Sequence, residues 1–241
     1  MDSEWLMRDL ANWKGCPAPR PVFIEGRYVR LEPYDRAQHL KALWGDAFGG
    51  LAINPLLRYF TQDDFSGIDA FDAWLTAAQE KSGWVTEVFR DKSTGKVVGM
   101  ANYMRADPAN GVVEVGAVAH GPLMARSTLS TEAQYLMARH VFEDLGYRRY
   151  EWKCHSENQP SRTTAARLGF TFEGIFRQHM ISKHANRDTA WFSIIDSEWP
   201  PIKAAFEAWL SPENFHGDGR QKRCLKDIRA DMKARSELES A

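Results

Sequence analysis

A carboxylate inside an apolar stretch and a loop that opens a helix lie close together in the sequence. Glu114 interrupts the run VVEVGAVA, which is typical of a buried strand, and an ionised carboxylate there is costly unless it is paired. The loop HGPLMARST follows and leads into a helical stretch from Leu129, and the free N–H groups at a helix N-terminus attract anions. This spacing predicts a site for a phosphate-bearing co-substrate beside a group that can accept a proton.

A second strand-like run and a second helix follow and supply an amide and a hydroxyl. RRYEWKCH is strand-like, and ENQPSRTTAARLGF becomes helical after its first residues. Asn158 is a typical N-cap for a helix over 159–168, with a proline in its first turn. Ser161 lies in that first turn, where its hydroxyl can bond the backbone or donate to a bound molecule.

Five short motifs follow one another along the chain. They are Glu114-Val115-Gly116, Ser130-Thr131-Glu132-Ala133, Asn158 with Ser161, the run LGFTFEG (168–174), and Arg187-Asp188-Thr189. In this order they resemble the GNAT acyl-CoA N-acyltransferases, and within these the ribosomal-protein N-acetyltransferases of the RimJ/RimL type. The resemblance implies an α/β fold of the GNAT kind, with a mixed, mostly antiparallel twisted sheet flanked by helices.

The resemblance also implies an activity, the acetyl-CoA-dependent N-acetylation of a primary amine by direct attack. The acceptor would be a protein N-terminus, an amino acid or a small amine, and neither a metal nor a covalent enzyme intermediate is expected. Glu114 is the implied base and Ser161 the implied acid, since Ala165 stands where many relatives carry a tyrosine. The residues implied to bind acetyl-CoA are Val115, Ala117, Val118, Ala119, Arg126, Ser127, Thr128, Leu129, Ser130 and Asn158.

The anion-binding loop departs from the family pattern at two positions. Ala125 stands where Gln or Arg is usual, and Thr128 where a central Gly is usual; Arg126 and the hydroxyls of Ser127 and Thr128 are available to compensate. Two other functions therefore stay open. One is a non-catalytic acyl-CoA-binding or regulatory module, and the other is an N-acyltransferase for a larger acyl group such as succinyl, to which Arg126 offers a counter-charge.

The amine decides how strong a base the reaction needs. An α-amino group of pKa about 7.8 costs about 1 kcal/mol to deprotonate at pH 7, and a lysine amine of pKa about 10.4 costs about 4.6 kcal/mol. A single carboxylate such as Glu114 therefore suits an α-amine better. A solvent-facing position or an ion pair with an arginine is the structural alternative for Glu114, with Glu151 as reserve base and His120 and His155 at strand ends nearby. By resemblance, the acceptor site would be flanked by Arg177, Gln178, Arg187 and Asp188.

Composition limits the classes of function. The chain has 241 residues, 44% hydrophobic and 26% charged, which is a globular balance, and its net charge of −1 gives no basic field for nucleic acid. Its three cysteines lie far apart without metal spacing, which favours a reducing compartment. The acidic N-terminus lacks signal-peptide features, and no apolar run approaches the ~18 residues of a membrane span. We expect a cytoplasmic protein with no membrane partner; a homodimer is implied by resemblance alone.

Periodicity predicts the elements that position these residues. Residues 1–24 are expected to form an N-terminal extension, 25–198 the acetyltransferase domain, and 199–241 a helical and polar C-terminal extension, either packed on the domain or ending in an exposed helix over 220–235. Expected strands cover 27–33, 84–90, 96–105, 112–119, 148–155, 172–182 and 189–195, the last two joined by a linker over 183–188. Expected helices cover 35–48, 68–81, 129–146 and 159–168.

Overall fold

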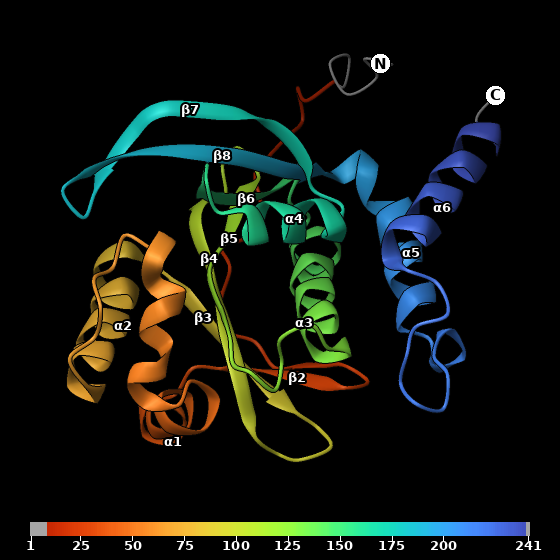
Figure 1. Cartoon of the computed structure of the whole chain (residues 1–241). Coiled ribbons are helices and arrows are strands. Elements are labelled where there is room, and N and C mark those ends of the chain that lie inside the picture. The colour runs from red at the N-terminus through yellow and green to blue at the C-terminus, as the bar shows by residue number, and fades with distance from the viewer. Residues whose placement is uncertain (1–8, 240–241) are drawn as a thin grey trace.

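The computed structural model describes residues 9–239 and contains an eight-stranded sheet with helices on both faces (Figure 1). The strand order is β1-β2-β3-β4-β5-β6-β8-β7, and neighbours pair antiparallel except β5 and β6, which are parallel. The first eight residues, which include most of the acidic N-terminal stretch, lie outside the described residues. The strands are β1 (Ile24–Glu25), β2 (Val29–Pro33), β3 (Val85–Asp91), β4 (Val97–Asp107), β5 (Val112–His120), β6 (Arg149–His155), β7 (Thr171–Ser182) and β8 (Ala185–Ile195).

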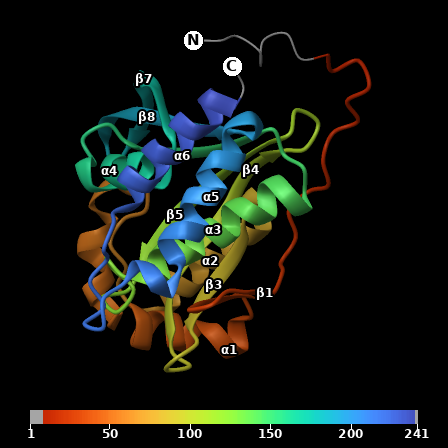
Figure 2. The same ribbon diagram turned by 90° about the vertical axis from the view of Figure 1, so that its right-hand side faces the viewer.

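The helices divide between the two faces of this sheet. Helices α1 and α2 cover one face, and α3, α4 and α5 lie on the other, with α6 packed on α5 (Figures 1 and 2). Within residues 9–239, none of the helices is long and apolar enough to cross a membrane. The helices are α1 (Arg36–Lys41), α2 (Ile68–Ser82), α3 (Thr128–Arg139), α4 (Gln159–Leu168), α5 (Trp199–Leu210) and α6 (Leu225–Glu239), with π-helical turns at Ala42–Ala47 and His140–Asp144 and a 3₁₀ helix at Gly50–Tyr59.

Alternation along β5 separates the core from the chemistry. Val113 and Val115 are buried in the core that α3 covers, whereas Glu114 between them faces the other side of the sheet. The parallel neighbour β6 repeats this arrangement, with Trp152 in the same core and Lys153 on the Glu114 side. Charged side chains from the two central strands therefore meet on one face.

The helix cap predicted at Asn158 is confirmed, and a second cap of the same kind begins α1. The Asn158 side chain accepts a hydrogen bond from the Ser161 N–H at the start of α4, whose bounds match the prediction. Asp35 likewise accepts from the Gln38 N–H at the start of α1. Local polar groups at helix starts leave a sequence signal that packing does not override.

The predicted linker over 183–188 is wrong. β7 and β8 are joined by Lys183 and His184 alone, and β8 already begins at Ala185. Both turn residues have positive φ, 50° and 62°, the left-handed conformation that tight two-residue hairpin turns require. The turn carries neither Gly nor Asn, which are the usual sequence signals for it, so the sequence predicted the two strands but not the tight turn between them.

The C-terminal extension packs on the rest of the protein. Trp199, Phe206 and Trp209 of α5 belong to the core that contains β5 and β6, and the α6 residues Leu225 and Ile228 are buried in the same cluster. The predicted exposed helix therefore begins later than expected, at Leu225, and buries one side. Of the two alternatives for this region, the packed one is confirmed.

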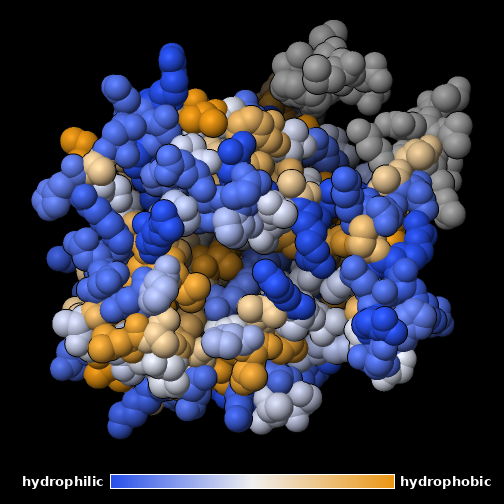
Figure 3. Space-filling view, viewed as in Figure 1, coloured by the Kyte–Doolittle hydropathy of each residue, from blue (hydrophilic) through white to orange (hydrophobic). Residues whose placement is uncertain are grey.

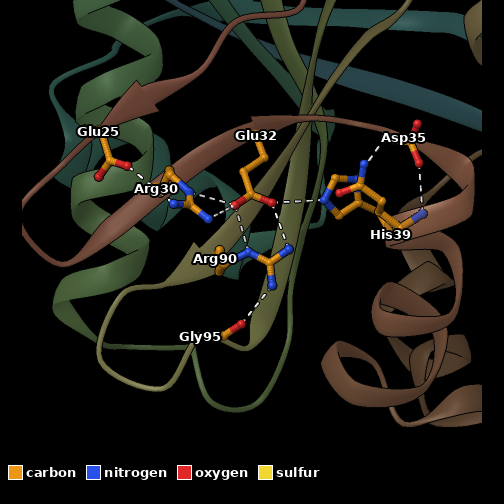
Figure 4. Close-up of polar contacts among 8 residues, drawn as sticks. Glu25, Arg30, Glu32, Asp35, His39, Arg90 and Gly95 are labelled. Carbon is orange, nitrogen blue, oxygen red and sulfur yellow. Dashed lines mark hydrogen bonds and ion pairs between the residues drawn. The ribbon is translucent and has the colours of Figure 1, made fainter.

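Buried charges join β2, β3 and α1 (Figure 4). Glu32 is 4% exposed, and although burial raises the pKa of its carboxyl, hydrogen bonds from Arg90, His39 and Arg30 outweigh this and lower it to about 2. His39 accepts the Asp35 N–H at Nδ1 (2.9 Å) and lies 3.0 Å from Glu32 at Nε2. Both ring nitrogens of His39 are thus occupied, and we interpret this cluster, which borders a cavity of about 450 Å³, as a structural clamp.

Glu87 on β3 provides a test of burial energetics. It is 0% exposed, and burial raises the pKa of its carboxyl to about 8, against a single hydrogen bond from the Val22 N–H. A raised folded-state pKa means that this group's stabilising contribution is complete below pH 4.5 and is lost as the pH rises through 8. Glu87→Gln should therefore raise the free energy of unfolding at pH 8 by about 4 kcal/mol relative to its effect at pH 4.

Urea unfolding of Glu87→Gln at pH 4 and pH 8 measures this difference. The same substitution at the exposed Glu80 of α2 is the control and should change neither value. Equal effects of Glu87→Gln at the two pH values would show that folding does not raise the pKa of Glu87.

Candidate active site

The two parallel central strands separate halfway along their length. Recorded pairing between β5 and β6 ends at Val115↔Trp152, although β5 continues to His120 and β6 to His155. Ala117 has φ 45°, an uncommon left-handed conformation for a residue with a Cβ, at the point where β5 bends away. The surface on this side is hollowed below the β7–β8 hairpin (Figure 3). The segment from Val115 to Ala119, predicted to bind the co-substrate, borders this separation.

The loop before α3 ends in a helix N-terminus, as the sequence predicts. The Ser127 hydroxyl donates to the Met124 carbonyl (2.6 Å), and the Ser130 hydroxyl donates to the Ser127 carbonyl (2.9 Å). Both hydroxyl protons are therefore committed within the loop, and the backbone N–H groups of the first turn remain as donors. Arg126, the residue expected to compensate for the missing Gln or Arg at position 125, is exposed and has φ 58°. Its side chain takes no part in the hydrogen bonds described above for this loop.

A cavity of about 800 Å³ adjoins this helix start. Its walls come from the loop before α3, from the last turns of α4, and from the C-terminal extension between Trp209 and Gln221. His120 borders it as well, and burial lowers the pKa of its imidazole to about 4, so it is neutral at physiological pH and a poor proton acceptor there. The sequence indicated the first wall and gave no sign of the other two.

Glu114 is 3% exposed and held by two cations. Its Oε2 lies 2.8 Å from Arg105 Nη1 and 3.1 Å from Lys153 Nζ, and Lys153 also lies 2.6 Å from Glu151 Oε2. The Lys153 ammonium is 3.6 Å from the centre of the Trp191 ring. Of the two structural alternatives for Glu114, the arginine pair is present and the solvent-facing position is not. These contacts explain how an ionised carboxylate is kept within the sheet.

Ser161 is both a backbone-capped residue and a hydroxyl facing the separated strands. Its Oγ accepts the indole N–H of Trp152 at 2.9 Å, so the hydroxyl proton remains to be donated elsewhere. Cys154 is one neighbour: burial raises the pKa of its thiol, and a hydrogen bond from Ser161 partly offsets this. A sulfur is therefore already within reach of this hydroxyl.

One of the residues expected to flank the acceptor contacts a helix that the sequence does not predict. Arg187 donates from Nη1 to the carbonyl of Tyr59 (3.0 Å), at the end of the 3₁₀ helix Gly50–Tyr59. Asp188 instead accepts from the backbone N–H of Gln178 (2.8 Å). Arg187 thus forms a contact between β8 and the 3₁₀ helix. His155 lies against Tyr59, with ring centres 5.4 Å apart.

Comparisons with known proteins identify the matched part of the chain. Residues 30–171 match a domain family described as Acetyltransferase (GNAT) domain. A GCN5-related N-acetyltransferase structure from Brucella melitensis is 47% identical with a TM-score of 0.86, covering 91% of this chain and 99% of its own. A probable GNAT acetyltransferase from Chromobacterium violaceum ATCC 12472 is 34% identical with a TM-score of 0.71, covering 80% and 95%.

A more distant structure shares the fold. Mycobacterium smegmatis RimJ, solved in complex with CoA-disulfide, is 21% identical with a TM-score of 0.60, covering 75% of this chain and 88% of its own. A search of curated proteins found no match. Among residues 9–239, no group of three or more His, Cys, Asp or Glu side chains is placed to hold a metal ion.

Proposed function

The chain belongs to the GNAT acetyltransferase family, and on that basis we propose that it transfers acetyl from acetyl-CoA to a primary amine. The observation that carries this proposal is the early end of β5–β6 pairing beside the N-terminus of α3. The co-substrate has amide groups along its arm and phosphates at one end. Unpaired strand N–H and C=O groups next to an anion site are the matching protein surface.

In the proposed reaction the neutral amine nitrogen attacks the thioester carbonyl carbon and the carbon–sulfur bond breaks. Glu114 takes the proton that the ammonium loses before attack. The second nitrogen proton leaves as the amide forms and neutralises the thiolate, towards which the Ser161 hydroxyl donates a hydrogen bond. A thiolate of pKa near 8.5 leaves readily, so a hydrogen bond suffices. Both ion pairs of Glu114 are made at Oε2, which leaves Oε1 to take a proton, and the indole is on the acceptor side of Ser161; these contacts support the two roles.

We further propose a RimJ/RimL-type enzyme, with a protein N-terminus, an amino acid or a small amine as acceptor. Mycobacterium smegmatis RimJ has the same fold and was solved with CoA-disulfide, which supports CoA as ligand here. An α-amine is favoured among acceptors because it needs only about 1 kcal/mol to become neutral at pH 7. Cys16, Cys154 and Cys224 are free thiols, which supports the cytoplasm as the compartment.

A mass-spectrometric screen of amines with acetyl-CoA tests the proposal. We expect acetylation of at least one α-amine together with stoichiometric release of free thiol. Binding of acetyl-CoA without thiol release from any amine would favour the non-catalytic alternative. Faster transfer from succinyl-CoA than from acetyl-CoA would favour the larger acyl group.

Ser161→Ala is expected to slow acetyl transfer about tenfold to a hundredfold, because its hydroxyl is the proposed donor to the leaving sulfur and Ala165 offers no tyrosine to replace it. The Asn158 cap is made to the backbone N–H of Ser161 and survives the substitution, but the buried Trp152 indole N–H loses its acceptor, so the melting temperature should fall by a few degrees. Measuring both quantities on one sample separates the two roles. A destabilised protein with full turnover would make Ser161 a structural hydroxyl.

A further inference from the structure

We propose that the C-terminal segment Trp209–Gln221 is part of the co-substrate site. With Arg167 it would form the wall that holds the phosphorylated adenosine end of CoA and distinguishes CoA from its analogue without the 3′-phosphate. This inference rests on the proposed function, because it assumes that CoA is the ligand. It assigns a role to a segment that lies outside the matched domain, which ends at residue 171.

The position of the cavity carries the first step. α5 lies beside α3 in both ribbon views and contacts it, and the segment that follows α5 reaches the α3 N-terminus (Figures 1 and 2). The cavity of about 800 Å³ is within the usual range for small-ligand sites. Without the segment, the side of the anion loop that faces away from the sheet would be open to solvent. From this segment, the cavity is lined by Trp209, Pro212, Phe215, Gly219 and Gln221.

The charge of the lining is the second step. Arg126 and Arg167 border the cavity, and its lining contains no Asp or Glu. Arg167 donates to the Thr131 hydroxyl (3.0 Å) and stacks 5.0 Å from the Trp209 ring centre, and burial lowers the pKa of its guanidinium. Behind it, Arg229 of α6 donates to the carbonyls of Ala166 and Arg167. Partly buried guanidinium groups without a carboxylate partner favour an anionic ligand.

An unpartnered buried amide is the third step. Gln134 of α3 borders the cavity and is 4% exposed, yet its Nε2 has no hydrogen-bond partner among the described residues. A buried donor without a partner is unfavourable, and a polar ligand in the cavity would satisfy it. A nucleotide phosphate or ribose supplies acceptors of this kind.

The wall itself is firmly built. Asn214 is 8% exposed, and its side chain donates to the carbonyls of Trp209 and Arg223 and accepts the Arg223 N–H. The Trp209 indole N–H donates to Gln221 Oε1 at 2.8 Å, and Phe215 pairs with Gln221 through a backbone bridge. The segment is therefore held in place without a ligand, as a preformed binding surface should be.

Two substitutions test the wall by titration calorimetry. Arg167→Gln should weaken CoA binding about 10- to 50-fold and dephospho-CoA binding by less than about threefold, because the lost charge faces the 3′-phosphate. Gln221→Glu keeps the oxygen that accepts from Trp209 and adds a negative charge on an exposed loop, so folding should be unaffected. It should weaken CoA binding about 5- to 10-fold, less so at high salt.

Arg220→Gln is the matched control. Arg220 lies in the same loop, pairs with Asp218, and does not border the cavity, so CoA affinity should stay unchanged. Acetyl-pantetheine, which lacks the nucleotide, should be turned over equally by the unaltered protein and all three variants. CoA affinity unchanged in both Arg167→Gln and Gln221→Glu would overturn this inference and leave the proposed function intact. No CoA binding by the unaltered protein would refute both.

Discussion

Glu114→Gln should lower acetyl transfer to an α-amine at pH 7 by about sixfold, the factor that corresponds to the cost of about 1 kcal/mol for neutralising the amine. Gln keeps the size of the side chain and removes its basicity. The reaction then depends on the amine that is already neutral in solution, and that fraction rises tenfold per pH unit below the amine pKa of about 7.8. The rate of the variant should therefore climb steeply between pH 6 and 8, and its pH profile should shift upward.

The surroundings of Glu114 make this substitution interpretable. Lys153 retains Glu151 at 2.6 Å and the Trp191 ring when the Glu114 charge is removed, so no ammonium is left buried and unpaired. CoA affinity should be unchanged, because the proposed anion site lies at α3. Glu173→Gln is the control. It removes a carboxylate that pairs with Arg149, which in turn pairs with Glu151, and the rate should stay unchanged.

An unchanged rate for Glu114→Gln from pH 6 to 9 would remove Glu114 from the mechanism. Its two ion pairs would then be its whole role, and Glu151 would become the next base to test. Glu151 is a weaker candidate because Lys153 and Arg149 both engage it, one at each carboxylate oxygen.

Local signals in the sequence predicted the positions of the strands and helices around the separated ends of β5 and β6. The cap at Asn158 and the loop before α3 depend on neighbours within a few residues, so their sequence carries the information. The Lys183-His184 turn has no such signal, because ordinary residues adopt left-handed conformations there under the pairing of β7 with β8. The wall formed by Trp209–Gln221 with Arg167 could not be predicted for another reason. Arg167 and Trp209 are distant in sequence and come into contact only in the folded chain.

Glu132 belongs to a motif that indicates the family, but its contacts are structural. It lies in Ser130-Thr131-Glu132-Ala133, which supported the family resemblance next to the anion loop. In the structure its carboxylate contacts the turn between β1 and β2. It accepts the backbone N–H groups of Arg27 (2.7 Å), Tyr28 (2.6 Å) and Val29 (2.8 Å). The motif therefore includes a residue whose contacts fix the fold.

Glu132→Ala should lower the free energy of unfolding by about 3–5 kcal/mol. Three N–H groups lose a charged acceptor at a site where Glu132 is 4% exposed, and each such bond is worth about 1.5–3 kcal/mol before water and backbone rearrangement compensate. For a chain of this size the melting temperature should fall by roughly 10 °C. Thermal unfolding measures the loss, with Glu80→Ala on the exposed side of α2 as control.

Turnover decides whether this carboxylate is structural. Below the transition, the Glu132→Ala protein should retain its CoA affinity and its rate per folded molecule. The α3 helix begins before Glu132, and the N–H groups proposed to bind the anion belong to its first turn. A stable variant with weakened CoA binding would contradict this. Weakened binding would mean that the β1–β2 turn, which Glu132 holds against α3, sets the position of the proposed anion site. The motif would then affect co-substrate binding through the packing of α3.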